Sequence, residues 1–192
     1  MTMDGPAIKG AALAARIKYM QDKATPEQQA RIRARLSPAF RETLDRGMMP
    51  SAWYPFAFTV EINRALDAVL GRADASLIPK LGRYSAEQVL HGVYKIFFKL
   101  GSPEFIISRV ANVWRQYYNS GKARVAWDAV PAGKQARLII EGFEAPAREN
   151  CLSMLGWIEG MLHMAGARDV RVEETTCRCR GGEACVFTAR WR

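Results

Sequence analysis

The chain has 192 residues, of which 49% are hydrophobic and 24% charged, and its formal net charge is +9 at pH 7. These proportions are those of a globular protein that buries its own core, which excludes a disordered chain and a small domain held together by disulfides. The first residues do not form a signal peptide and no run of about eighteen apolar residues occurs, so we expect a cytoplasmic protein without a membrane span.

The N-terminal two-thirds of the chain has the apolar spacing of helices. The expected helices cover residues 11–21, 26–36, 38–45 and 55–70, the last with Pro55 at its first position. Ser85-Ala86-Glu87-Gln88 has the form of a capping box and predicts that another helix begins there. A further helix is expected to begin at Ser102-Pro103-Glu104. This part of the chain is therefore expected to be all helical.

At Gly121 the apolar period changes from 3.6 to 2, which predicts strands. Two alternating segments, 123–129 and 136–140, flank a Pro-Ala-Gly-Lys turn and predict a β-hairpin. A helix from Pro146 separates it from two further strands, 169–176 and 184–191. The order of helices, hairpin, helix and hairpin predicts an α+β fold with a four-stranded antiparallel sheet.

The chain is expected to form a single domain over residues 1–192. Within it, residues 1–50 are interpreted as a helical N-terminal extension and residues 51–192 as a core of the ligand-binding type. The basic residues are spread over both halves of the chain, so the charge gives no support to a nucleic-acid surface.

Three of the four cysteines lie close together around a Gly-Gly turn near the C-terminus, and free thiols in a reducing compartment can coordinate a metal. The strand period places Glu174 and Cys185 on the core side, and Cys151 lies on the apolar stripe of its helix. A buried carboxylate needs a positive partner. Zinc held by Cys151, Glu174, Cys177 and Cys185 would supply one and would be structural, because no coordination position stays open.

Two alternatives to this ligand set remain open from the residues themselves. Cys179 forms a Cys-x-Cys pair with Cys177, and a four-cysteine site would leave Glu174 out. The cysteines would otherwise serve as small hydrophobic residues or reactive thiols without a metal.

At these residues the chain resembles the 4-vinyl reductase domain, which is also the sensory domain of phenol-responsive bacterial activators. The resemblance rests on the order Cys, Glu, Cys, Cys with steps of 23, 3 and 8 residues (151 to 174, 174 to 177, 177 to 185) and on the helix Cys-Leu-Ser-Met-Leu-Gly-Trp-Ile-Glu-Gly. It covers about residues 145–190 and implies that Cys179 is not a ligand. The chain also resembles an uncharacterised paralogous family of small myxobacterial proteins, through Ser51-Ala52-Trp53-Tyr54-Pro55 and Leu100-Gly101-Ser102-Pro103.

Relatives of the 4-vinyl reductase domain include haem-based nitric-oxide sensors and small subunits of vesicle-tethering complexes, which share an α+β fold around an apolar cavity. The resemblance therefore implies a sensory or regulatory domain with structural zinc that binds a hydrophobic small molecule or a partner. Haem is not expected, because the Tyr-x-Ser-x-Arg signature of the haem sensors is absent and the two histidines, His91 and His163, have no such context.

The candidate lining of a ligand cavity is aromatic and consists of Phe56, Phe97, Trp114, Tyr117 and Trp127. The same residues would serve equally in a solid core, and the alternative function is then a homodimeric interaction or scaffold module without a cavity. The chain has no Ser/His/Asp or Gly-rich phosphate signature, so we do not expect an enzyme.

Overall fold

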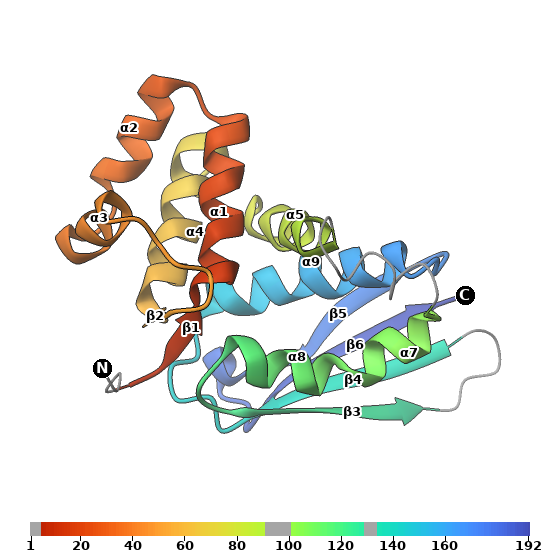
Figure 1. Cartoon of the computed structure of the whole chain (residues 1–192). Helices are drawn as coiled ribbons and strands as arrows, with labels where there is room; N and C mark the ends of the chain where they lie inside the picture. The colour runs from red at the N-terminus through yellow and green to blue at the C-terminus, as the bar shows by residue number, and fades with distance from the viewer. Residues whose placement is uncertain (1–4, 91–100, 129–133) are drawn as a thin grey trace.

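The computed structural model describes residues 5–90, 101–128 and 134–192. A helical N-terminal part stands on a C-terminal part built around a sheet, and buried side chains of both form one hydrophobic core (Figure 1). The N-terminal elements are β1 (Ala7–Lys9), α1 (Gly10–Lys23), α2 (Pro26–Ala34), α3 (Pro38–Asp45), β2 (Trp53–Pro55), α4 (Ala57–Leu70) and α5 (Ile78–Leu90). None of the helices in these described ranges is long and apolar enough to cross a membrane.

The first three expected helices are confirmed, and side-chain caps explain where two of them begin. Thr25 and Gln28 form a reciprocal capping box at the start of α2. The hydroxyl of Ser37 accepts from the backbone N–H of Phe40 at the start of α3. Both helices have proline in the first turn, where its missing N–H costs no hydrogen bond.

The expected helix start at Pro55 is wrong. Pro55 belongs to β2, which pairs antiparallel with β1 through Ile8 and Tyr54, and α4 begins only at Ala57. The pairing joins segments far apart in the sequence, so local spacing gave no sign of it. It also ties the start of the chain to the entry of α4 (Figure 1).

The expected helix start at Ser85 is also wrong, because α5 already begins at Ile78. Ser85 lies inside the helix, where its hydroxyl donates to the carbonyl oxygen of Leu81, a bond that serine makes in helix interiors. A proline at the second helical position, Pro79, is the signal that fits the true start. The last residues of the expected helix, including His91 and Phe97, lie outside the described residues.

The four-stranded antiparallel sheet is confirmed. Its strands are β3 (Lys122–Asp128), β4 (Lys134–Glu141), β5 (Arg171–Thr176) and β6 (Cys185–Trp191), in the spatial order β3-β4-β6-β5. One face is buried, as Leu138 and Phe187 show, and the other is mostly exposed and carries ion pairs such as Arg137 with Asp128. The sheet therefore needs cover on one face only.

That cover comes from α7 (Pro103–Ser108), α8 (Val110–Tyr117) and α9 (Arg148–Met164), which lie over the sheet in Figure 1. The single helix expected after Ser102 is divided into α7 and α8 at Arg109. The helix expected from Pro146 begins at Arg148. A short 3₁₀ turn, η1 (Arg178–Arg180), connects β5 to β6.

Glycines allow α5 and α9 to pack almost backbone to backbone. A Cβ atom at Gly156 would lie 1.7 Å from the carbonyl oxygen of Pro79, and one at Gly82 would lie 2.0 Å from that of Ser153. Side chains cannot relieve such contacts, because the opposing atoms belong to the backbone. The glycines of α9 thus have a packing role.

Candidate functional site

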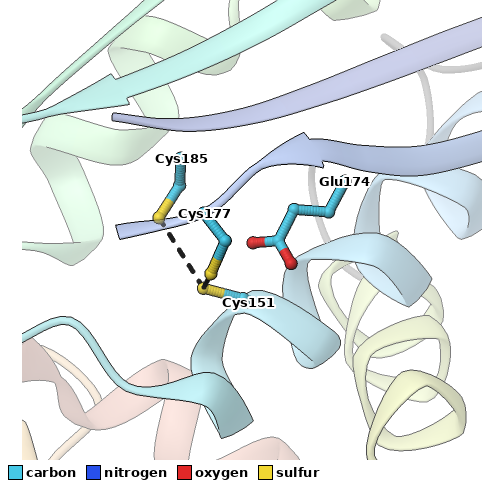
Figure 2. A group of neighbouring side chains, drawn as sticks. All are labelled: Cys151, Glu174, Cys177 and Cys185. Atoms are coloured by element: carbon cyan, nitrogen blue, oxygen red, sulfur yellow. Dashed lines mark hydrogen bonds between the residues drawn. The ribbon is translucent and has the colours of Figure 1, made fainter. Parts of the chain in front are cut away.

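Three cysteines and a glutamate come together between the first turn of α9 and the neighbouring ends of β5 and β6 (Figure 2). Cys151 comes from α9, Glu174 from β5, Cys177 from the residue after β5, and Cys185 from the first position of β6. One ligand atom from each of the four lies within 4.8 Å of those of the others. The structure therefore brings together the four residues predicted as metal ligands.

The cluster is largely buried, and its thiols lie within hydrogen-bonding distance of one another. The sulfur atoms of Cys151 and Cys185 are 3.7 Å apart, and those of Cys151 and Cys177 are 3.9 Å apart. The hydrogen bond between Cys151 and Cys185 raises the pKa of the Cys151 thiol and lowers the pKa of Cys185, which also accepts from the backbone N–H of Arg178. Burial raises the pKa of Cys177. These shifts favour deprotonation of Cys185 before Cys151.

Glu174 has a cationic partner that the sequence did not reveal. Its Oε2 atom is ion-paired with the guanidinium of Arg148, from the start of α9, and its side chain is only 3% exposed. Its Oε1 atom is buried and has no hydrogen-bond partner in the described part of the chain. Arg148 thus balances the charge that the sequence analysis assigned to zinc, while one carboxylate oxygen stays free to bind.

Cys179 lies apart from the cluster. It sits in η1 and is exposed. A four-cysteine arrangement without Glu174 is therefore not the geometry of this chain.

A second candidate site is a cavity of about 70 Å³ between the N-terminal helices and α8 and α9. Its apolar lining residues are Ile8, Ala11, Ala12, Ala15, Val110, Val113, Trp114, Met154 and Trp157. Its polar lining residues are Arg16, Thr59, Ser85, Tyr117, Tyr118 and Ser153. The cavity is thus apolar on most sides and has one polar wall.

Arg16 is the centre of the polar wall and is only 6% exposed. Its guanidinium donates to Asn63 Oδ1 at 3.3 Å and to the hydroxyls of Ser85 and Ser153. Burial lowers the pKa of Arg16 to about 10, so the side chain keeps its charge at neutral pH. A permanent cation therefore lies in the wall of an apolar cavity.

Two of the five aromatic residues expected to line a cavity lie in the lining of this one. Trp114 and Tyr117 line the cavity, whereas Phe56 packs edge-on against Phe143 elsewhere in the core. Trp127 is 48% exposed and lies beside Trp191 on the sheet. Phe97 lies outside the described residues.

The sequence analysis missed Arg16, although one signal for it exists. Arg16 follows Leu13 by three residues and precedes Met20 by four, and both neighbours are buried, so it occupies the apolar stripe of α1. A charged residue at such a position marks a partner or a ligand. Thr59 and Ser153 carried no comparable signal.

No protein-family model matches the chain, and no curated protein sequence matches it. Solved structures do match, and they are H-NOX domains, which bind haem and nitric oxide or oxygen. An H-NOX protein from S. oneidensis in the Fe(II)NO state has a TM-score of 0.73 at 13% identity, over 96% of this chain and 99% of that chain. An oxygen-binding H-NOX domain related to soluble guanylate cyclases has a TM-score of 0.66 at 14% identity, over 96% and 95%.

A third structure, the Fe(II) unliganded H-NOX protein from K. algicida, has a TM-score of 0.65 at 14% identity and covers 96% of each chain. At these identities the likeness shows the fold, and the chain has the α+β fold of H-NOX domains. The neighbours are named as binding domains and not as enzymes, which agrees with the expectation that this chain is not an enzyme.

Two expectations are corrected by these neighbours. The resemblance to the 4-vinyl reductase domain is wrong, because the matching structures are H-NOX domains, which had entered only as relatives. The expected cofactors, structural zinc without haem, are contradicted, because the matching domains are haem proteins. Arg148 supplies the positive charge that the buried carboxylate of Glu174 needs, so the burial of Glu174 does not by itself require zinc.

Proposed function

We propose that this chain forms a single sensory or regulatory domain that is not an enzyme. It binds a small molecule in the cavity beside Arg16. The cavity is the observation that carries the proposal, because it combines an apolar lining with convergent polar groups, the usual composition of a ligand site. The H-NOX neighbours, which bind diatomic gases through haem, support a sensing role for the fold. A cytoplasmic location belongs to the same proposal.

Haem is the cofactor that the fold implies, and the described residues do not fit it. The cavity of about 70 Å³ is far below the roughly 300–1,000 Å³ of ordinary cofactor and ligand sites. His163 is exposed at the end of α9, near Glu159 and away from the cavity lining. The guanidinium of Arg16 and the indoles of Trp114 and Trp157 reach the cavity. We therefore derive no binding step through haem.

The alternative, a homodimeric interaction module with a solid interior, makes a different prediction about small ligands. Such a module would gain stability with protein concentration and not with ligand. A ligand that binds the folded state stabilises it by RT ln(1 + L/Kd), where L is the free ligand concentration, so the melting temperature rises with the logarithm of that concentration once it exceeds the dissociation constant. Thermal melts at two protein concentrations, with and without small amphiphiles, separate the two functions.

The direct test fills the cavity. We expect n-butanol and butyramide to raise the melting temperature of the wild-type chain, and Ala15→Leu to abolish this response, because three added carbon atoms occupy the space. Ala34→Leu, at an exposed position of α2, is the matched control and keeps the response. A wild-type protein that responds to neither compound and also fails to bind the corresponding acid, or an Ala15→Leu protein that responds fully, would contradict the proposal.

A separate proposal concerns Cys151, Glu174, Cys177 and Cys185 as ligands of a thiophilic metal ion. The unpartnered Oε1 atom of Glu174 favours it, since a buried carboxylate oxygen without a donor is costly. Sulfur atoms bound at about 2.3 Å around a tetrahedral ion lie about 3.8 Å apart, close to the 3.7 and 3.9 Å found here.

Titration with Co²⁺ tests this ligand set. We expect thiolate-to-cobalt absorption with one ion per chain in the wild type and in Cys179→Ser, and its loss in Cys185→Ser. Cys179 is the matched control because it is exposed and apart from the cluster. Equal absorption in the Cys185→Ser and wild-type proteins would overturn the ligand assignment.

A further inference from the structure

The charge of Arg16 is buried without a counter-charge. Its acceptors in the described part of the chain are all neutral: Asn63 Oδ1, the hydroxyls of Ser85 and Ser153, and the carbonyl oxygen of Ala12. Among the described residues, no carboxylate lies within 4.0 Å of the guanidinium. Burying a cation in this way costs several kcal/mol unless an anion completes the site.

One N–H group of Arg16 has no hydrogen-bond acceptor among the described residues. A guanidinium has five N–H groups. The N–H of Nε donates to Asn63. The two N–H groups of Nη1 donate to Ser85 and Ala12, and one N–H of Nη2 donates to Ser153. One N–H of Nη2 is therefore free of an acceptor among the described residues, on the residue that lines the cavity.

Two neighbouring polar groups are also buried without partners. The hydroxyl of Thr59 lines the cavity and makes no hydrogen bond to the described residues, and its side chain is 3% exposed. The Nδ2 group of Asn63, fully buried beside Arg16, is likewise unpaired. Buried donors are almost always satisfied in folded proteins, so unpaired donors gathered around a cation indicate that an acceptor is missing.

We propose that the cavity binds the carboxylate of a small organic acid. One carboxylate oxygen accepts hydrogen bonds from the guanidinium of Arg16 and from the hydroxyl of Thr59. This inference rests on the proposed function and names the ligand class of the same site. The apolar body of the acid lies against Ile8, Val110, Trp114 and Met154. A carboxylate fits better than a phosphate, because a single positive charge and few donors balance one negative charge.

The size of the cavity limits the acid. One water needs roughly 10–15 Å³, so a cavity of about 70 Å³ holds some five waters or an acid of comparably few heavy atoms. Acetate and butyrate are in this range, and benzoate is at its upper limit. Each has an amide of nearly the same shape that lacks the charge, which makes a matched pair of probes.

The experiment measures binding of acetate, butyrate and benzoate to the full chain by calorimetry, each against its amide at the same ionic strength. We expect at least one acid to bind ten times more tightly than its amide. In Arg16→Gln the ratio falls to about one, whereas in Arg64→Gln, an exposed arginine paired with Glu149, it is unchanged. If Arg16→Gln does not fold, Thr59→Val is the replacement variant. It is expected to weaken binding of the acid threefold or more, with little effect on binding of the amide.

Each result decides between the two proposals. An acid and an amide that bind equally, in the wild type, overturn the carboxylate inference and leave the cavity function standing. Absence of binding by every acid, amide and alcohol overturns both. A preference for the acid that survives in Arg16→Gln and in Thr59→Val overturns the assignment to this cavity.

Discussion

Arg16 donates a hydrogen bond to the hydroxyl of Ser153, a residue 137 positions further along the chain. The bond joins α1, near the N-terminus, to α9, which covers the sheet (Figure 1). The candidate ligand cavity lies at this junction. The site therefore exists only when the N-terminal helices and the C-terminal part have assembled.

Removal of residues 1–50 is expected to prevent folding. Leu13, Ile32 and Phe40 have no exposed surface and belong to the same core as Phe187 of the sheet. Their loss uncovers apolar surface on α4, at about 25 cal/mol per Å². Circular dichroism and solubility of residues 51–192 provide the measurement, and a soluble, cooperatively melting fragment would show that the first fifty residues are a separable extension.

Gly156→Ala is expected to destabilise the chain by 3 kcal/mol or more, on the order of a severe overpacking substitution. A methyl group there would meet the backbone of Pro79, which cannot move without shifting α5. Gly160→Ala is the matched comparison and is expected to cost about 1 kcal/mol, because its methyl would lie 3.1 Å from the side chains of Ala86 and Arg83. Urea denaturation measures both, and equal effects would contradict the backbone contact.

Arg148→Met is expected to destabilise the metal-free chain by about 1–3 kcal/mol, because it leaves the carboxylate of Glu174 buried without its cation. The loss is smaller than for a fully buried pair, since Arg148 is 33% exposed. Adding Glu174→Gln should recover part of it by removing the stranded charge. Melting curves after chelator treatment provide the measurement. An Arg148→Met protein with an unchanged melting temperature would show that the ion pair does not stabilise the fold.

Tyr118 is expected to titrate above the usual pH range of tyrosines. Burial raises its pKa to about 12, and its hydroxyl donates to Asn150 at 3.0 Å. Because the folded state favours the protonated phenol, the contribution of Tyr118 to stability is complete below the unfolded pKa of about 10 and is lost as the pH rises from there to 12. Tyrosinate absorption measures the titration, and Tyr118→Phe removes that step.

The charge on Arg16 opposes this shift, since it lowers the pKa of Tyr118. A carboxylate bound at Arg16 should therefore raise the pKa of Tyr118 further. An unchanged titration at saturating acid would count against contact between the ligand and this part of the cavity.

Local sequence determined much of this protein. Caps at Thr25 and Ser37 set the starts of α2 and α3, and the change of apolar period at Gly121 predicts the sheet. Both signals could be read from the sequence because they depend on residues only a few positions apart. The same alternation placed Glu174 and Cys185 on one side of the sheet, and the structure brings them together with Cys151 and Cys177.

Tertiary structure decided the rest, because it depends on contacts between distant segments. The β1–β2 pair and the ion pair of Arg148 with Glu174 join residues that local patterns cannot relate. In the sequence, the position of Arg16 on the apolar stripe of α1 is the one signal that sets it apart. Only the packing of α1 against α4, α5 and α9 buries its charge among neutral acceptors and makes it a candidate for ligand binding.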